Sequence, residues 1–276
     1  MVTELGPFTP GVVVSATASV RPLLSFRNFS LRCDKSDPQI SFQAPWNWEL
    51  DQAKRIAVIT NSSFLRYQLS AALAGLVPPA SGEMLTEGVV GWPVGGEGGL
   101  DGKLRITHAC NFLATVYSDC LEKSLVSVDE FWGFMSAAEI NPRSIIKELS
   151  REQKDCFFLA LSVLFSFDLY LISKTRYLMS RPAKPLRALL LKQLEGKTLF
   201  ATSTNSRFQR EFCTDGLVLD SMGQILFAGG VSEAIEWADQ NLEASDVTDP
   251  DDEQLDIGID LLNTELSDDP SGDFFV

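Results

Sequence analysis

Residues 58–76 read VITNSSFLRYQLSAALAGL and contain a change of pattern that indicates the fold class. The apolar, β-branched run 55–59 ends within this segment, as expected for a buried strand, and the polar residues 60–63 follow it. Leucines then recur every three or four residues up to Leu76, which is helical spacing. A strand, a polar loop and a helix in this order predict the first unit of an α/β protein.

Apolar runs on both sides of this segment predict further strands and helices. Strands are expected at 24–31, 40–42, 84–91, 169–172, 198–202 and, as a hairpin, at 216–219 and 224–228, with Trp46 and Trp48 in a turn. Helices are expected at 184–194, at 232–242 and over most of 107–165, including 154–165. Leu24, Phe26 and Phe29 are the expected inward side chains of the first strand.

The negative charge of the chain is concentrated at its carboxyl-terminal end. The formal net charge is -14, but residues 1–210 contain 23 basic and 19 acidic residues, whereas residues 211–276 contain 18 acidic residues and no basic one. A nearly neutral body argues against a polyanion-binding protein, and no nucleic-acid partner is expected. Residues 244–276 are predicted to be disordered. They are either a solvating extension, a segment that folds on a partner, or a phosphate mimic that docks on basic residues of the body.

The composition also excludes several kinds of site. Five cysteines, without CxxC spacing, predict reduced thiols and no structural zinc. A single histidine, His108, leaves no basis for a histidine metal centre or catalytic triad, so no metal site is expected. The most apolar stretch, 156–172, is shorter than the ~20 residues of a membrane-spanning helix, so no direct membrane insertion is expected. The N-terminal arm 1–22 lacks a basic segment before its apolar run, so no secretory signal is expected.

Residues 58–76 and four later stretches resemble motifs of the ABC-transporter ATPases, in the branch that serves capsule-polysaccharide exporters. The matching segments are Ala74-Gly75-Leu76 for the family's AGL, Ser81-Gly82-Glu83 for SGE, 91–95 with 98–99 for SWPxG…GG, 166–172 for DFDxYLI and 211–215 for EFCD. The resemblance implies a P-loop NTPase-like ABC ATPase domain over residues 23–243. That domain comprises an antiparallel β subdomain, a parallel-sheet core and a helical subdomain near 107–165, and the acidic tail 244–276 follows it.

The phosphate-loop motif is degenerate in this chain. Such a loop needs glycines so that backbone N–H groups can curl around phosphates, a lysine that reaches them, and a hydroxyl for Mg²⁺. Aligned with the family, Thr60 and Leu65 replace the framing glycines, Arg66 replaces the lysine, and Tyr67 replaces the hydroxyl residue. A side chain at Leu65 obstructs the phosphates, and a guanidinium is no equivalent of an ammonium here. No nucleotide binding is therefore expected.

Catalytic positions of the family are replaced as well. Ser173 and Lys174 stand where the resemblance places the Walker B aspartate and the catalytic glutamate, so metal ligation and water activation are both lost. In the signature motif Ser150 is kept, but Glu152 replaces the glycine and would repel a phosphate.

Three further family positions are changed. Ser180 replaces the D-loop aspartate, Thr204 the switch histidine and Cys33 the adenine-stacking tyrosine. Losing one charge-stabilising group already costs orders of magnitude in rate. Six independent losses predict that the chain does not hydrolyse ATP and needs no cofactor.

Three basic residues form a candidate anion patch where ATP lies in the family. Arg66 lies at the start of the first helix of the α/β unit, and Lys174 and Arg176 follow an apolar strand. Helix N-termini favour anions, so Arg66 could bind one; alternatively it pairs with a local acid. Lys174 and Arg176 are alternatively solvated loop charges.

The resemblance and the lost motifs together predict a pseudo-ATPase that acts as a scaffold or regulatory subunit in bacterial capsule or exopolysaccharide export or biogenesis. Two alternatives stay open: a functional ATP-binding subunit of such an exporter, and a standalone protein-interaction module. The implied partners are a membrane subunit of a polysaccharide exporter or synthase, or an ATPase paralogue, in a homo- or heterodimer. The implied location is cytoplasmic, peripheral at the inner membrane through these partners. Residues 95–102 are either a flexible loop or a contact with the membrane subunit.

Overall fold

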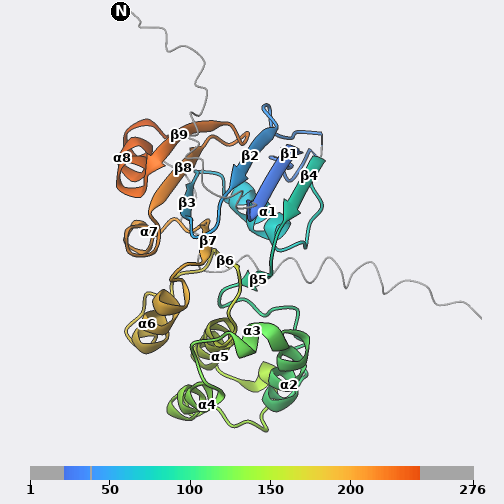
Figure 1. Cartoon of the computed structure of the whole chain (residues 1–276), viewed down its shortest axis with the longest axis vertical. Helices are drawn as coiled ribbons and strands as arrows, with labels where there is room; N and C mark the ends of the chain where they lie inside the picture. Colours follow the sequence, from blue (N-terminus) through green and yellow to red (C-terminus); the bar gives the residue numbers. More distant parts are fainter. Residues whose placement is uncertain (1–21, 38, 243–276) are drawn as a thin grey trace, which may run out of the picture.

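The computed structural model describes residues 22–37 and 39–242, arranged as two β-sheets and a group of helices (Figure 1). The smaller sheet has the strand order β2-β1-β4, and the larger has the order β5-β6-β7-β3-β8-β9. The predictions for the N-terminal arm (apart from Pro22) and for the acidic tail 244–276 lie outside the described residues.

The smaller sheet is antiparallel and is built on aromatic residues. Its strands are β1 (Leu24–Ser30), β2 (Trp46–Leu50) and β4 (Ser81–Thr86). The expected inward residues of β1 are buried, and Phe26 and Phe29 lie opposite Trp48 and Trp46 of β2. Such cross-strand aromatic pairs stabilise a sheet.

Two predictions for this region were wrong. Trp46 and Trp48 are not in a turn, because their rings pack against β1 and pull residues 46–50 into the sheet. Residues 40–42 form no strand. Only an isolated bridge, Arg32 to Ser41, joins that segment to the chain that follows β1.

The larger sheet is parallel except for its last strand. Its strands are β3 (Arg55–Ile59), β5 (Val90–Pro93), β6 (Leu169–Ile172), β7 (Thr198–Ala201), β8 (Asp215–Leu219) and β9 (Ile225–Gly230), with β9 antiparallel to β8. All four residues of β6 and of β7 are buried, as is typical of parallel strands covered on both faces. Strand β3 lies between β7 and β8, which places the loop after it near the centre of one sheet edge.

The single strand expected at 84–91 is two strands in different sheets, β4 and β5. The chain turns between them at Gly88, whose φ is +110°. A Cβ on Gly88 would lie 2.7 Å from Oδ2 of Asp168, and the same oxygen accepts a hydrogen bond from the Val89 backbone N–H at 2.9 Å. This close approach to Asp168 ends one strand and starts the next.

The helices form two groups (Figure 1). Those beside the sheets are α1 (Ser63–Leu73), α7 (Ser206–Phe212) and α8 (Val231–Asn241), whereas α6 (Lys184–Gln193) lies below them next to α5. Those gathered below the sheets in Figure 1 are α2 (Ile106–Val116), α3 (Ser118–Glu122), α4 (Val128–Ala137), the short 3₁₀ helix η1 (Ile146–Glu148) and α5 (Arg151–Leu164). Helix α7 was not predicted because its seven residues show barely two turns of periodicity. The Asn205 side chain caps it, and Phe208 and Phe212 anchor it in the core.

Trp92 joins the larger sheet to the second group of helices. Its indole N–H donates to the hydroxyl of Ser162 in α5 at 3.1 Å, and the Gly95 backbone N–H donates to the same oxygen at 3.1 Å. The indole ring also packs against Tyr117, Phe165 and Phe167. Residues of the exporter-like motifs therefore hold the two parts of the fold together.

Candidate functional site

The polar residues singled out in the sequence gather where parallel strands of the larger sheet end. Thr60 follows β3, Ser173 follows β6 and Thr202 follows β7. The Thr202 backbone N–H donates to the Ile172 carbonyl at 2.9 Å, which keeps these two strand ends side by side. Ligands of open α/β sheets bind at such carboxyl ends, so this edge is the candidate site.

In the loop after β3, backbone N–H groups donate hydrogen bonds to side chains of the same loop. The Ser62 hydroxyl caps α1 by accepting a hydrogen bond from the Leu65 N–H at 3.1 Å, and the Ser62 N–H donates to the Thr60 hydroxyl at 3.3 Å. A phosphate-binding nest needs residues in the left-handed region, and among the described residues with positive φ none lies between 60 and 66. Leu65 is completely buried in the apolar core. The loop after β3 therefore forms the N-terminal cap of helix α1.

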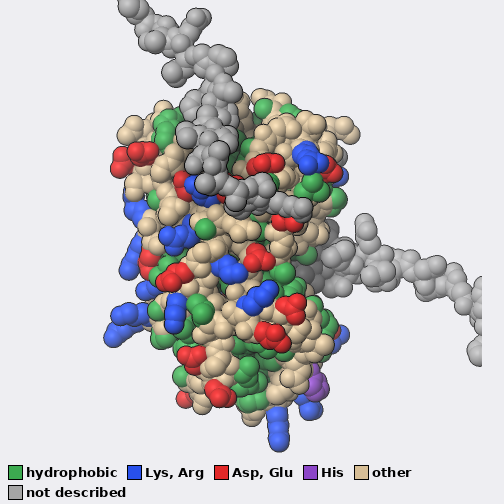
Figure 2. Space-filling model, in the orientation of Figure 1, with side chains coloured by type: hydrophobic (Ala, Val, Ile, Leu, Met, Phe, Trp, Pro, Cys, Tyr) green, Lys and Arg blue, Asp and Glu red, His purple; other side chains and the backbone are tan. Residues whose placement is uncertain are grey.

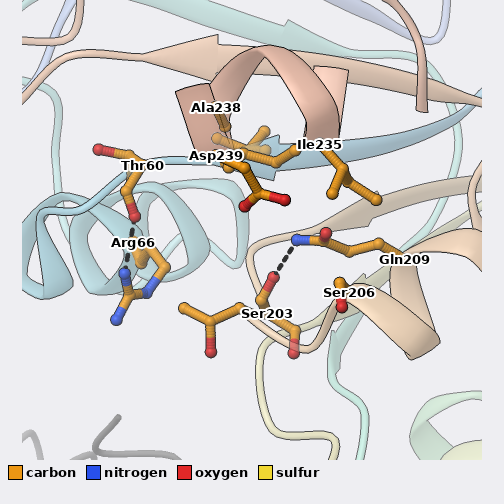
Figure 3. A pocket seen from close by; sticks show the side chains of 11 residues that line it. Thr60, Arg66, Ser203, Ser206, Gln209, Ile235, Ala238 and Asp239 are labelled. Carbon is orange, nitrogen blue, oxygen red and sulfur yellow. Dashed lines mark hydrogen bonds between the residues drawn. The ribbon is translucent and has the colours of Figure 1, made fainter. Parts of the chain in front are cut away.

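Arg66 folds back over this loop. Its Nη1 donates to the Thr60 carbonyl oxygen at 2.8 Å, and Figure 3 shows the guanidinium lying beside the loop. Tyr67, one residue further along α1, is half-buried. The Arg66 guanidinium, which the sequence resemblance aligns with the family's lysine, therefore contacts the backbone of the loop.

The segment after β6 places a buried hydroxyl between two exposed cations. Ser173 is half-buried, Lys174 and Arg176 are exposed, and Thr175 between them is fully buried. The Thr175 hydroxyl lies 2.9 Å from that of Ser203, after β7. No carboxylate stands at position 173 or 174, where the sequence resemblance predicts the metal-binding and water-activating groups of an ABC ATPase.

Asp155 of α5 is an acid that lies close to these cations. Burial raises the pKa of its carboxyl group, while the nearby charges of Arg151, Lys174 and Arg176 act in the opposite direction. This interaction locates the beginning of α5 beside the segment that follows β6. Sequence analysis missed Asp155 because only the packing of α5 brings it to the sheet edge.

A small cavity lies between the loop after β3, the residues after β7 and helix α8 (Figure 3). Its volume is about 100 Å³, and Arg66, Thr204 and Asp239 are among the residues that line it. The Gln209 amide, buried beside it, donates to the Ser203 carbonyl at 2.6 Å. Pockets for small-molecule ligands usually measure roughly 300–1,000 Å³, so this cavity is smaller than a typical ligand pocket.

The signature-motif residues form the start of α5. The Ser150 hydroxyl accepts from the Gln153 N–H at 3.2 Å, and the Gln153 side chain accepts from the Ser150 N–H at 3.1 Å, which is a capping box. Glu152 is exposed in the first turn, where a carboxylate interacts favourably with the helix dipole. Both residues have a structural role within their own helix.

Two remaining positions have environments of their own. Ser180 is half-buried, and its hydroxyl oxygen is buried with no hydrogen-bond partner among the described residues. Cys33 is half-buried, and burial together with the Asp220 charge raises the pKa of its thiol to about 11. The described part of the chain holds no group of three or more His, Cys, Asp or Glu side chains placed to bind a metal ion.

The three predicted basic residues lie at one edge but contact different groups. Arg66 contacts Thr60, and Lys174 and Arg176 act on Asp155. The Thr175–Ser203 contact joins the two places, because Ser203 also lines the cavity beside Arg66. Anion binding by the three residues stays a prediction.

Comparisons with known proteins agree with this architecture. No family model matches the chain. The polysialic acid transport ATP-binding protein KpsT of Escherichia coli is 28% identical over 183 residues, covering 65% of this chain and 82% of KpsT. The capsule polysaccharide export ATP-binding protein CtrD of Neisseria meningitidis serogroup B is 21% identical, covering 63% and 79% of the two chains. Over about two thirds of its length, the chain is therefore similar to ATP-binding proteins of polysialic acid transport and capsule polysaccharide export.

Solved ABC transporter structures share the fold of this chain. The ATP-binding subunit of an ABC transporter superposes with a TM-score of 0.54 and 15% identity, covering 89% of this chain and all of that subunit. A bacterial Atm1-family ABC exporter with ATP bound gives a TM-score of 0.57 and 16% identity, covering 83% of this chain and 44% of the exporter. The predicted ABC ATPase fold is therefore confirmed. Within the described residues, no helix has the length and apolar character needed to cross a bilayer.

Proposed function

We propose that this chain is an ABC ATPase-type component of capsule or exopolysaccharide export or biogenesis that does not hydrolyse ATP and acts as a scaffold or regulatory subunit. The polysaccharide context is supported by its relatives, which are named as ATP-binding proteins of polysialic acid transport and capsule export. The loss of hydrolysis is supported by the residues at the sheet edge.

The hydrogen bonding of the loop after β3 carries the second part of the proposal. The N–H groups of Ser62 and Leu65 donate to hydroxyls of the same loop, and the Arg66 side chain donates to the Thr60 carbonyl. A phosphate would have to replace these bonds and displace a buried leucine. Each buried polar group left without a partner costs about 1–3 kcal/mol, so the rearrangement opposes nucleotide binding.

The residues after β6 also support the proposed loss of ATP hydrolysis, because they lack the side chains that catalysis needs. Mg²⁺ is held by carboxylate and other oxygen ligands, and the attacking water must be positioned by an acceptor. Ser173 and Lys174 supply a hydroxyl and a positive charge in their place. An ammonium there repels the metal ion and has donors but no acceptor for the proton of the attacking water.

The proposed partners are a membrane subunit of a polysaccharide exporter or synthase, or an active ATPase paralogue in a heterodimer. Similarity to subunits of assembled transporters supports such a partnership. A second candidate function is ATP binding within an exporter. It is favoured by the names of the relatives and by Arg66, which keeps a cation at the phosphate position.

The test measures nucleotide binding and turnover by the full chain. MgATP is titrated by calorimetry and phosphate release is assayed, alone and with a candidate membrane subunit, beside an active capsule-export ATP-binding protein purified in the same way. We expect no binding heat up to millimolar MgATP and no phosphate release above the blank, together with a stable complex with the partner. Mg²⁺-dependent turnover that follows the purified chain would overturn the proposal.

A further inference from the structure

Strand β9 forms one edge of the larger sheet and contains neither a charged residue nor a proline. Such residues protect an edge strand, because its outward backbone groups can otherwise pair with another strand. The other edge strands of the two sheets follow this rule, since β2 contains Glu49, β4 contains Glu83 and β5 ends at Pro93. Strand β9 reads ILFAGG, and its Ile225 and Leu226 are exposed. It is therefore the edge at which a further strand is expected to pair.

The backbone of Ala228 faces away from the sheet. Residues of an antiparallel pair alternate between those that exchange hydrogen bonds with the partner strand and those that do not. The Val231 N–H donates to the Thr214 carbonyl at 3.0 Å, and the register of β8 and β9 continues from there. Phe227 is therefore in a position that bonds to β8, and Ala228 is in one that does not. In the part of the chain that the structure describes, no strand lies on the outer side of β9.

A groove lies beside this edge, between β9 and helix α8. Its volume is about 340 Å³, and it is lined by Phe227 of β9 and by Glu233, Glu236, Trp237 and Gln240 of α8. The rings of Phe227 and Trp237 are stacked with their centroids 5.9 Å apart, and both side chains are half-buried. A strand added to β9 would place one row of its side chains about 5 Å from the side chain of Phe227. The groove therefore offers such a strand an apolar surface.

The N-terminal arm has the sequence pattern of a strand that fits this place. Residues 12–20 read VVVSATASV, contain no charge and are rich in β-branched residues, which favour strands. From Val14 to Val20, apolar and hydroxyl-bearing residues alternate strictly. This alternation is typical of a strand with one face against the protein and the other in water. The apolar face consists of valine and alanine, whose small side chains suit a groove of this size.

Charge distinguishes the arm from two other occupants of the groove. Glu233 and Glu236 are exposed beside it, and Figure 2 shows acidic side chains where Figure 1 places α8. Residues 243–276 contain 12 acidic residues and no basic one, and a second copy of β9 would bring the glutamates of its own α8, so both are repelled. Residues 1–21 contain only Glu4 and Arg21 as charged residues, so the arm is the occupant that charge permits.

The chain enters the described fold within reach of β9. The Leu23 N–H donates to the Leu50 carbonyl at the end of β2, at 2.8 Å. At the start of β2, the Trp46 indole donates at 3.0 Å to the carbonyl of Gly223, two residues before β9. The five residues of β2 span about 15 Å, which separates the two points. The 21 residues before Pro22 span about 70 Å when extended, so the arm reaches β9 with residues to spare.

We propose that residues 12–20 pair with β9 of the same chain as a seventh strand of the larger sheet, with their apolar side chains in the groove beside Phe227 and Trp237. Backbone hydrogen bonds give such a pairing its affinity, and the groove gives it selectivity. Covalent attachment supplies an effective concentration of roughly millimolar, so a short strand suffices. This inference goes beyond the proposed function and does not depend on whether the chain hydrolyses ATP.

The test measures hydrogen–deuterium exchange of single β9 amides in the full chain by NMR. The Ala228 N–H is the reporter, because it points away from β8, and the Phe227 N–H is the internal reference. Thr17→Pro with Ala18→Pro removes two adjacent N–H groups, one of which faces β9 in any register. We expect the Ala228 amide to exchange at least about tenfold more slowly in the wild type than in this variant, because pairing protects it. The Phe227 amide should change far less.

Val2→Pro with Thr3→Pro is the matched control, since it places two prolines outside the alternating stretch. It should leave the Ala228 exchange rate unchanged, and both variants should keep the circular dichroism of the wild type. Equal exchange of Ala228 in the wild type and in the variant at 17 and 18 would overturn the proposal. Protection that increases with protein concentration would also overturn it, because a second copy would then cover the edge. No nucleotide enters the measurement, so a failed ATPase prediction gives a separate result.

Discussion

The hydroxyl of Thr175 lies 2.9 Å from the hydroxyl of Ser203, and both side chains are at least 98% buried. This contact joins the segment that follows β6 to the segment that follows β7. A buried hydrogen bond has its largest effect on stability when one partner is removed, because the other is left unsatisfied.

Thr175→Val should therefore destabilise the protein by about 1–3 kcal/mol. Ser203→Ala should cost at least as much, because the Ser203 hydroxyl also accepts a hydrogen bond from the Asn205 N–H at 3.2 Å. The double variant should lose less than the sum of the two, because both changes remove the Thr175–Ser203 hydrogen bond. Urea unfolding of the four proteins measures this coupling. Thr115→Val is the control, since Thr115 is exposed on α2 and its loss should change stability by no more than about 0.5 kcal/mol. Additive effects at 175 and 203 would contradict the interpretation.

Leu65→Gly introduces the glycine that precedes the lysine in the phosphate loop of ABC ATPases, and we expect it to destabilise the fold. The Leu65 side chain is completely buried, and the residue lies inside α1. Loss of the side chain costs about 2–5 kcal/mol, and glycine in a helix adds about 0.5–1 kcal/mol. Thermal and urea unfolding measure the change.

Leu76→Gly is the matched control for this substitution. Leu76 follows α1 and is 73% exposed, so its replacement should cost far less than that of Leu65. A Leu65→Gly protein as stable as the wild type would show that the loop tolerates a glycine, and it would weaken the argument against nucleotide binding.

Asp168→Asn tests the carboxylate that ties β5 to β7. Burial raises the pKa of Asp168, but hydrogen bonds from Val89 and Lys197 outweigh it and hold the pKa below its usual range. A lowered pKa stabilises the fold above the unfolded value of about 3.9, and this stabilisation is lost as the pH falls through the folded pKa. The variant should be less stable at pH 7, by less than about 1 kcal/mol because the ion pair is partly exposed.

The difference should narrow below about pH 4, where the wild-type carboxylate also becomes protonated. Thermal unfolding of both proteins between pH 3 and pH 7 gives the comparison. A stability difference that stays constant over this range would mean that the charge of Asp168 does not contribute to stability and that only the packing of its side chain does.

The cysteines should react slowly in the folded protein. Burial raises the pKa of Cys110 and Cys213 to about 12, and that of Cys33 to about 11 with a contribution from Asp220. The thiolate is the reactive form, so little of it exists at pH 8. An Ellman titration should show slow release before unfolding and five thiols in guanidinium. A fast first thiol that persists in Cys33→Ser would contradict this prediction.

Much of the fold could be predicted because its strands are buried runs with clear boundaries. The segments 55–59, 169–172 and 198–202 are apolar and β-branched, and all three lie in the larger sheet within one residue of expectation. The turn expected at Trp46 failed because cross-strand packing on Phe26 and Phe29 overrides local turn signals. Strand 84–91 divided because Gly88 meets Asp168, 80 residues away in the sequence.

The sequence predicted which residues form the candidate site better than it predicted the contacts between them. Sequence alignment located Ser173, Lys174 and Thr204, and the fold brings their segments to one sheet edge. The hydrogen bond from the Arg66 side chain to the Thr60 carbonyl could not be predicted, because it depends on the rotamer of Arg66. The positions of Asp155 and Asp239 near the candidate site could not be predicted either. Each residue lies on a helix that is distant in the sequence and reaches the sheet edge only through packing.

The burial of Leu65 limits how this loop could acquire a glycine-rich sequence. Domains of this size are stable by about 5–15 kcal/mol, so the few kcal/mol lost on changing Leu65 to glycine are a large share of the total. A single substitution at Leu65 would therefore pass through a weakened protein before any neighbouring position has changed. A glycine at this position would require compensating changes elsewhere in the core, because the folding requirement itself opposes the first step.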